Sequence, residues 1–236
     1  SLRAALGPKY PGAPAALRLT RADRLVAAGQ YTAARAEYRA LSTGLKGLAR
    51  EQAAVRIGAC DYHLKADLRA WRGLQALVVK EPDAAAERLY YLAACARRLK
   101  KAREFTDLVT RLGRDHPAVR WHEEALFSAG NYYFLENEPI EYQKYYRTLV
   151  ERFPQSPRAV QAHWKLAWRA YLDKSDQARR LFEDHLRLYP DSPQATAAVY
   201  WLARLAQGRS DLVAARALYQ RLVSAYPHYY HALLAG

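Results

Sequence analysis

The chain has 236 residues, of which 51% are hydrophobic and 12% aromatic, a composition that excludes a disordered chain. Ala and Leu supply 45 and 32 residues while Val and Ile together supply 13, which indicates helices and excludes a fold based on a sheet. Thirty-seven Lys and Arg against 23 Asp and Glu give a formal charge of +14, so acidic partners are expected. The longest uncharged stretch is too short for a membrane span.

Repeated segments follow one another along the chain. Two degenerate copies, at 31–41 and 66–77, come first. From residue 116 onward the copies end in corners of a ring residue and Pro, spaced 36 or 37 residues apart: His116-Pro117, Phe153-Pro154, Tyr189-Pro190 and Tyr226-Pro227. A large aromatic precedes each Pro by about 26 residues, and this spacing predicts that Trp164 and Trp201 are equivalent and buried.

Each repeat reads as a pair of amphipathic helices. Pro stops the second helix, and Ser156-Pro157 and Ser192-Pro193 are predicted to start the next repeat, with Ser as the cap. A hairpin of this kind cannot bury its own apolar face, so neighbouring hairpins stack. The sequence therefore predicts an all-α fold, an α-α superhelix (solenoid) of TPR-like helical hairpins with a period of about 36 residues and about twelve helices. Residues 1–19 are expected to be partly irregular, and residues 20–236 to form the repeats.

The pairing of helix aromatics, small residues and a terminal Pro resembles the tetratricopeptide repeat. The motifs FPQSPRAVQAHWKLAWRAYL and LYPDSPQATAAVYWLARL, with the final ARALYQRLVSAYPHYYHALLAG, further resemble the superhelical region of soluble lytic murein transglycosylases. That resemblance implies a periplasmic protein acting on peptidoglycan, with a signal peptide outside this sequence and a catalytic domain after residue 236. The family's Glu-Ser motif is absent, and the chain contains no Met. No catalytic residue can therefore be assigned, and this piece itself is not expected to be an enzyme.

Three functions are compatible with these features. The first is the non-catalytic platform of a lytic transglycosylase, which shapes or positions peptidoglycan or another acidic cell-wall polymer. The second is a free-standing periplasmic scaffold that binds cell-envelope proteins. The third, an RNA-binding repeat, is disfavoured because the matched positions Leu92, Ser128, Lys165 and Leu202 do not form a base-reading code.

Few residues offer other chemistry. His122-Glu123-Glu124 lacks the second His of a helical zinc motif, so neither a metal nor a cofactor is predicted. Cys60 and Cys95 lie one repeat apart, too far for a disulfide in stacked hairpins, and are expected to be buried thiols.

Ligand contacts are expected on the concave face of the first helices, because helical repeats bind through that surface. Matching the repeats places five residues there: Ser128, Tyr132, Lys165, Arg169 and Arg209. Lys165 and Arg169, one helical turn apart, are predicted to attract acidic cell-wall material.

Overall fold

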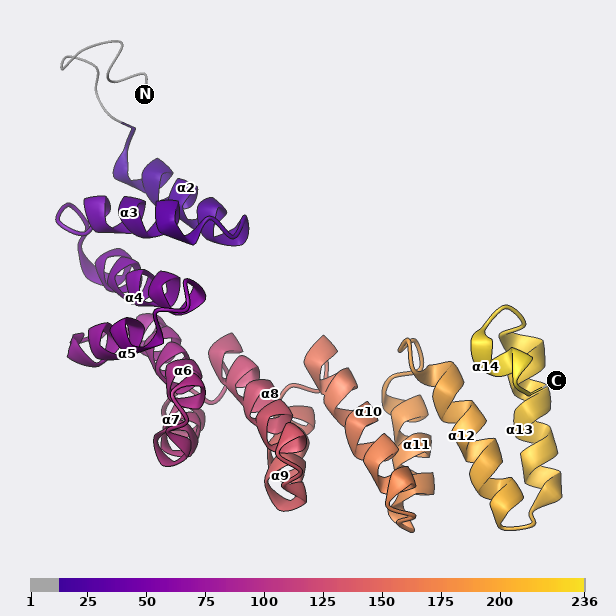
Figure 1. Cartoon of the computed structure of the whole chain (residues 1–236). Helices are drawn as coiled ribbons and strands as arrows, with labels where there is room; N and C mark the ends of the chain where they lie inside the picture. The colour runs from indigo at the N-terminus through magenta and orange to yellow at the C-terminus, as the bar shows by residue number, and fades with distance from the viewer. Residues whose placement is uncertain (1–12, 236) are drawn as a thin grey trace. The chain divides into compact units, whose positions relative to one another are not determined.

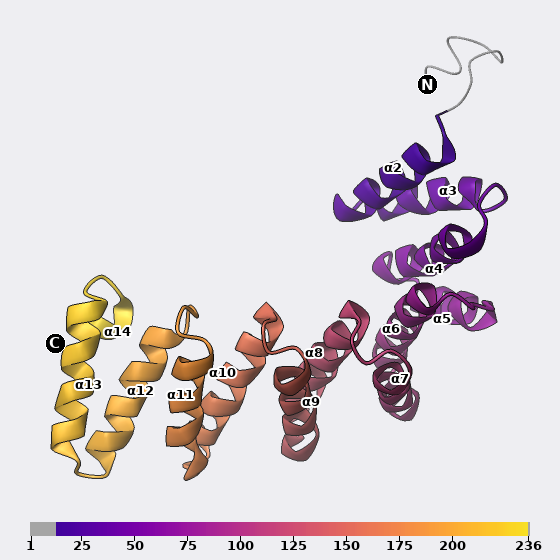
Figure 2. The same cartoon turned by 180° about the vertical axis from the view of Figure 1, so that it is seen from behind.

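The computed structural model describes residues 13–235 (Figures 1 and 2). Within that range the chain forms thirteen helices and no strand, which confirms an all-α fold. The helices are arranged as two compact units, unit 1 up to Ala125 and unit 2 from Leu126. The first helix within that range begins at Ala15, and residues 1–12 of the segment expected to be irregular lie outside the described residues.

Unit 1 contains three helical hairpins and the first turns of the helix that leads into unit 2. The hairpins pair α2 with α3, α4 with α5 and α6 with α7. Their bounds are α2 Ala15–Ala27, α3 Tyr31–Leu41, α4 Gly47–His63, α5 Asp67–Ala76, α6 Pro82–Arg98 and α7 Ala102–Asp115. The first helices α4 and α6 also contact each other, so consecutive hairpins of unit 1 stack.

Unit 2 continues the alternation of first and second helices, which Figures 1 and 2 show from opposite sides. Its helix bounds are α8 Arg120–Leu135, α9 Pro139–Arg152, α10 Pro157–Leu172, α11 Gln177–Leu188, α12 Ala195–Gly208, α13 Leu212–Ala225 and the single turn α14 Tyr230–Leu233. The first residues of α8 belong to unit 1. Helix α10 contacts both α9 and α11, and α12 contacts both α11 and α13.

The turn inside each hairpin contains one residue in the left-handed region, with φ between 53° and 71°. These residues recur every 35 to 37 positions: Gly29, Lys65, Lys100, Asn137, Lys174 and Ser210. The backbone therefore confirms the predicted period of about 36 residues. Only the first of these positions is a Gly, the residue that adopts this conformation without steric cost.

The corners between hairpins also share one geometry. His116, Phe153, Tyr189 and Tyr226 cap the second helices with φ between −130° and −139° and ψ between 50° and 60°. The Pro that follows each of them has no amide hydrogen to extend the helix, so the chain turns there. The corners seen in the sequence are thus structurally equivalent.

After a corner, the next helix begins as predicted at only one of the two Ser-Pro pairs. Ser156 caps α10 by accepting a hydrogen bond from the Arg158 amide at 3.0 Å, and Pro157 is the first helical residue. Helix α12, however, begins at Ala195 rather than at Pro193. The Ser192 hydroxyl lies 3.0 Å from His185 Nε2. Ser192 therefore pairs with a side chain instead of capping the helix.

The predicted equivalence of Trp164 and Trp201 is wrong, because their packing partners differ. Trp201 packs on Trp168 and Tyr171 of the preceding first helix, with ring centroids 4.9 and 4.8 Å apart. Trp164 instead packs on Phe182 of its own hairpin, at 5.7 Å.

The cause is a difference of one residue between the two spacings. The last two corners lie 37 residues apart, whereas the left-handed residues Lys174 and Ser210 of the last two hairpins lie 36 apart. Trp201 therefore corresponds to Lys165, and Tyr200 corresponds to Trp164. Both Trp residues are half-buried rather than fully buried.

Candidate functional site

The first helices of unit 2 expose a row of side chains in matching register. Helices α10 and α12 each contribute two positions to this row, three residues apart, and α8 contributes one; Lys165 and Trp201 contact the previous hairpin. We call this row the unit 2 A-face; it consists of Asn131 on α8, Lys165 and Trp168 on α10, and Trp201 and Arg204 on α12.

Lys165 lies at the junction of α8, α9 and α10. Its ammonium donates a hydrogen bond to Asn131 Oδ1 and a second, at 3.3 Å, to the Tyr146 hydroxyl. The Tyr146 hydroxyl in turn donates to Asn131 Oδ1 at 2.9 Å. Three rings surround the ammonium, those of Phe127, Phe134 and Tyr146, with centroids 5.3 to 5.6 Å away. Burial lowers the pKa of Lys165, because the rings and the uncharged polar groups solvate an ammonium less well than water does.

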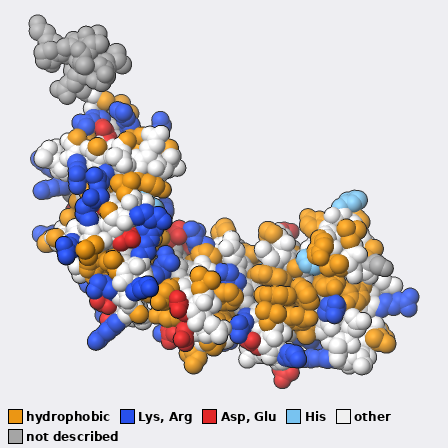
Figure 3. Space-filling model, viewed as in Figure 1, with side chains coloured by type: hydrophobic (Ala, Val, Ile, Leu, Met, Phe, Trp, Pro, Cys, Tyr) orange, Lys and Arg blue, Asp and Glu red, His pale blue; other side chains and the backbone are white. Residues whose placement is uncertain are grey.

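The neighbouring part of the unit 2 A-face is aromatic. Trp168 lies 5.5 Å from the Tyr171 ring in a stacked arrangement and 4.9 Å from the Trp201 ring. One turn further along α10, Leu172 is 54% exposed. Hydrophobic side chains gather over α10 and α12 on the face of the molecule that Figure 3 shows.

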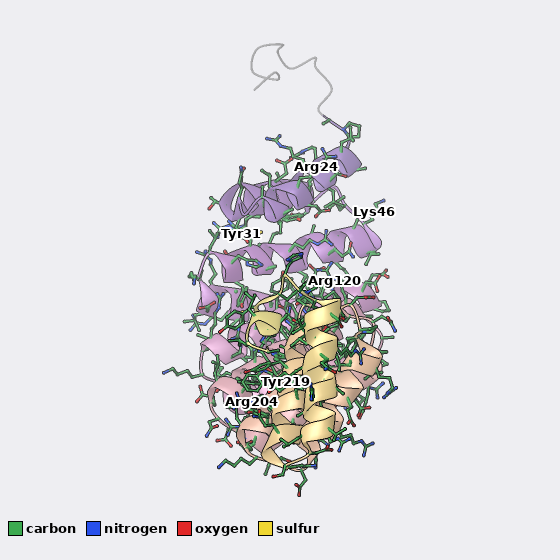
Figure 4. The ribbon with its side chains drawn as sticks, turned by 90° about the vertical axis from the view of Figure 1, so that its right-hand side faces the viewer. Arg24, Tyr31, Lys46, Arg120, Arg204 and Tyr219 are labelled. Carbon is green, nitrogen blue, oxygen red and sulfur yellow. The ribbon has the colours of Figure 1, made fainter. Side chains whose placement is uncertain are left out.

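Arg204 ends the row on α12. It donates a hydrogen bond to the Tyr200 hydroxyl at 3.3 Å and lies close enough to Tyr219 to affect its titration (Figure 4). Tyr219 in turn donates to Gln207 Oε1 at 3.2 Å. The cation at this end of the row is therefore hydrogen-bonded to the phenol oxygen of Tyr200.

The first helices of unit 1 carry charged residues on the same face, and Arg56 and Asp23 occupy the register of Lys165 and Asn131, whereas Glu87 is buried. Arg56 on α4 donates to Asp23 on α2 at 2.7 Å and to Glu87 on α6 at 3.4 Å. The contact between Arg56 and Asp23 is the counterpart of the contact between Lys165 and Asn131. Burial raises the pKa of the Glu87 carboxyl, and the Arg56 guanidinium partly offsets this effect.

Small side chains leave a hollow of about 210 Å³ behind these charges in unit 1, with Ala59 and Cys60 among the residues that line it. The rings of His63, Tyr91 and Trp121 line it, with Tyr91 5.6 Å from Trp121. Behind the lining, His63 stacks on Tyr31 at 4.4 Å. The Arg120 guanidinium lies 4.6 Å from the Trp121 ring centroid; Tyr31 and Arg120 are labelled in Figure 4. Two cations and two carboxylates line the hollow, so its charges balance.

The structure separates the five residues predicted to share one binding face. Lys165 and, on α8, Ser128 and Tyr132 come from adjacent first helices. Arg169 donates to Asp173 at 2.9 Å and lines a cavity of about 540 Å³ together with residues of the second helices α9 and α11. Arg209 follows α12 and lies 3.8 Å from Asp176. That these residues bind a common ligand stays a prediction.

Sequence reasoning missed a buried histidine pair in unit 2. His163 and His185 approach each other with their Nδ1 atoms 3.3 Å apart, and both side chains are buried. Burial, together with the neighbouring His163, lowers the pKa of His185 to about 4. The two residues are 22 positions apart on different helices, and no spacing rule in the sequence connects them.

Two further properties concern residues 13–235 as a whole. No group of three or more His, Cys, Asp or Glu side chains in that range is placed to hold a metal ion. Every helix in the same range is too short or too polar to cross a bilayer. Cys60 and Cys95 are both buried and unbonded, as expected.

Comparisons with known proteins agree with this geometry. The tetratricopeptide repeat family matches residues 197–229, which cover most of α12, all of α13 and the following corner. No curated protein matches the chain.

Among solved structures, a tetratricopeptide repeat protein from Parabacteroides merdae is 15% identical with a TM-score of 0.49, over 89% of this chain and 79% of that one. BtubC (BKLC) from P. vanneervenii is 13% identical with a TM-score of 0.50, over 92% of this chain and 93% of that one. At such identity the likeness concerns the fold alone. Taken with the matched repeat and the hairpin geometry, the chain is a TPR-like helical repeat protein.

Proposed function

We propose that the chain is a binding scaffold that holds a protein partner along its first helices. The observation that carries this proposal is the row of half-buried and exposed side chains on the first helices that keeps one register from hairpin to hairpin. The pairs Arg56–Asp23, Lys165–Asn131 and Trp201–Trp168 occupy the same register positions at three of the contacts between neighbouring first helices. Repeat proteins bind through extended surfaces of this kind, because each hairpin adds similar contacts to the next.

Site-specific photo-crosslinking in the native host tests this proposal. A benzophenone amino acid replaces the exposed Gln161 on the first helix α10 or, as a matched control, the exposed Gln220 on the second helix α13. We expect discrete protein adducts from position 161 and few from position 220. Adducts at equal yield from both positions, or at neither, would contradict a role for the first helices.

We further propose, as a second candidate, that the chain is the non-catalytic platform of a periplasmic soluble lytic transglycosylase that acts on peptidoglycan. Two features support it: the motifs around the last corners of the sequence, and the formal charge of +14, which suits acidic cell-wall material. In this role the repeats position the glycan or the enzyme and perform no catalysis.

Binding to purified sacculi at low and high salt tests the second candidate. Long-range attraction is screened over about 8 Å at physiological salt, so charge-driven binding weakens as salt rises. A Lys165→Glu/Arg169→Glu variant is expected to bind more weakly than an Arg179→Glu/Arg180→Glu control. Sacculi that retain neither the native chain nor its variants would contradict this candidate, as would a gene with no Glu-Ser motif after codon 236.

A further inference from the structure

The unit 2 A-face contains positive charge that the first helices do not neutralise. Helices α10 and α12 contain four Arg and Lys but no Asp or Glu. The second helix between them, α11, has the opposite pattern: its Arg179 and Arg180 each face a carboxylate one turn away, at 2.8 and 3.7 Å. Of these cations, Lys165 and Arg204 hydrogen-bond to uncharged groups, whereas Arg169 pairs with Asp173 after the end of α10.

Lys165 is the residue of this surface whose surroundings best indicate what a partner must supply. Its side chain is half-buried, and an ammonium has three N–H donors. Two of them reach Asn131 and Tyr146, both uncharged, and no carboxylate among the described residues lies within ion-pair distance of its Nζ atom. A half-buried cation without an anion pays a desolvation cost that a partner's carboxylate would offset.

An apolar anchor lies one turn away on the same helix. Trp168 is three residues after Lys165, so the two side chains share one face of α10. The rings of Trp168, Tyr171 and Trp201 form a half-buried platform, and Leu172 extends it with a side chain that is 54% exposed. Large amphipathic rings in such positions are typical of the residues that dominate the free energy of protein–protein binding.

We infer that the unit 2 A-face binds a protein segment that places a carboxylate on Lys165 and an apolar or aromatic side chain on the Trp168–Trp201 platform. The inference rests on the proposed scaffold function and adds the chemistry of the partner. The Cβ atoms of residues three apart on a helix are separated by about 5–6 Å, a spacing close to that of two residues of an extended segment or one turn of a helix. The bound segment therefore carries Asp or Glu two residues from a Phe, Trp or Leu when extended, or three to four residues from it when helical.

Selection from a random dodecapeptide library displayed on phage tests this inference on the whole chain. We expect enriched peptides to contain an Asp or Glu at one of the stated spacings from an apolar residue. The enriched peptides are then synthesised with a fluorescent label, and their dissociation constants are measured by anisotropy. Soluble muropeptides from digested sacculi serve as competitors.

The variant Lys165→Met tests the charge, because Met has a similar length and suits a cage of rings. A charge-assisted hydrogen bond accounts for about tenfold or more in affinity, so Lys165→Met is expected to weaken binding by at least about tenfold. Trp168→Leu tests the platform and is expected to weaken it as well. The matched control is Lys144→Gln on the second helix α9, where an exposed cation is removed; a change below about twofold is expected there.

Changing the peptide keeps the test independent of protein folding. Replacing the peptide's Asp or Glu with Asn or Gln should weaken binding to the native chain but should have no further effect on binding to Lys165→Met. Enriched peptides without carboxylates, unchanged affinity in Lys165→Met, or displacement of the peptide by muropeptides would overturn the inference. Peptides whose affinity falls when Arg120 of unit 1 is replaced, but not when Lys165 is replaced, would overturn the inference while leaving the scaffold function intact. If no peptide is enriched on the native chain, both proposals fail.

Discussion

Units 1 and 2 use the same hairpin but fill the space between neighbouring first helices with different chemistry. In unit 1 this space contains the ion pairs of Arg56 with Asp23 and Glu87, at 2.7 and 3.4 Å, beside the rings of Tyr62 and Tyr91. In unit 2 it contains the contact between Lys165 and Asn131 and the rings of Trp168 and Trp201. Unit 1 carries 23 Lys and Arg against 13 Asp and Glu, whereas unit 2 carries 14 against 10, so most of the excess charge lies in unit 1.

The difference shows that the register of the repeats is independent of the residues that occupy it. Arg56 contacts Asp23 where Lys165 contacts Asn131 and where Trp201 contacts Trp168. The turns and corners determine which positions of neighbouring helices are in contact. The side chains at those positions determine whether the contact is ionic, polar or aromatic. The two units should therefore respond differently to loss of a ring, to acid and to loss of an ion pair, but alike to changes in the shared turns.

The largest effect is expected from Phe182→Ala in unit 2. Phe182 is fully buried and packs against Trp164 and Tyr171, so truncation should lower the free energy of unfolding by about 3–5 kcal/mol. Urea denaturation measures the loss, and hydrogen exchange with mass spectrometry should locate it in unit 2. The control is Leu188→Ala, at a side chain 41% exposed, for which a much smaller loss is expected. Equal losses in both variants would show that the rings do not stabilise unit 2.

Acid should destabilise unit 2 next most strongly, through the histidine pair. The folded pKa of His185 is about 4, below its ordinary value of 6.5, so the unfolded chain binds the proton first. Stability is therefore complete above pH 6.5, falls between pH 6.5 and about 4 by on the order of 3 kcal/mol, and is constant below that range as far as His185 is concerned. Burial also lowers the pKa of His163, an effect that Asp184 opposes and Arg187 reinforces.

Urea midpoints measured between pH 7 and pH 4 check this pH dependence. His185→Gln should flatten the profile across that range, even if the variant is less stable at pH 7. His228→Gln, at an exposed position after the last corner, should leave the profile unchanged. A profile that is as steep in His185→Gln as in the native chain would rule out the pair as its source.

A smaller loss is expected from Asp61→Ala in unit 1. The Asp61 side chain is 6% exposed, and its removal leaves the Arg35 guanidinium, 20% exposed, without its carboxylate. Hydrogen bonds to charged groups contribute about 1.5–3 kcal/mol, and a loss of that size is expected in urea denaturation. Asp107→Ala removes an exposed pair with Arg103 and should cost less than about 0.5 kcal/mol. Similar losses from the two variants would mean that burial adds nothing to the pair in unit 1.

The smallest effect is expected where the units are alike. Lys65 in unit 1 and Lys174 in unit 2 both have a positive φ, at 62° and 53°. Replacing either with Gly relieves the steric cost of that conformation, partly offset by the greater freedom of Gly in the unfolded chain. We expect a gain of about 0.5–1 kcal/mol at both sites, measured as a higher urea midpoint. A gain in only one unit would show that the turns are not equivalent.

The sequence predicted the corners because their chemistry is local. A ring residue followed by Pro ends a helix wherever it occurs, and Tyr189 and Tyr226 do so in the structure with nearly the same dihedral angles. The turns inside the hairpins were not predicted, since Lys65, Lys100 and Lys174 are ordinary helix-surface residues. Only their backbone angles mark them as turn positions, and those angles depend on how the two helices pack.

The candidate site was predicted only in part, for the same reason. Lys165 was chosen correctly as a residue of the first helices, but its contacts with Asn131 and Tyr146 depend on the rotation of three helices about their axes. A shift of one residue in counting was enough to pair Trp201 with Trp164 instead of with Lys165. Arg169 lies one turn after Lys165, yet it lines a cavity with the second helices, because a helical turn of four residues overshoots a full rotation by about 40°.

The two buried thiols have a practical consequence for chemical labelling. Burial raises the pKa of Cys60 to about 11 and that of Cys95 to about 12, so almost none of either is thiolate at neutral pH. Maleimides and iodoacetamides react with the thiolate and need access to the sulfur. Burial prevents that access at both residues. A cysteine introduced at an exposed position such as Gln161 should therefore be modified selectively in the folded chain, without first removing the native pair.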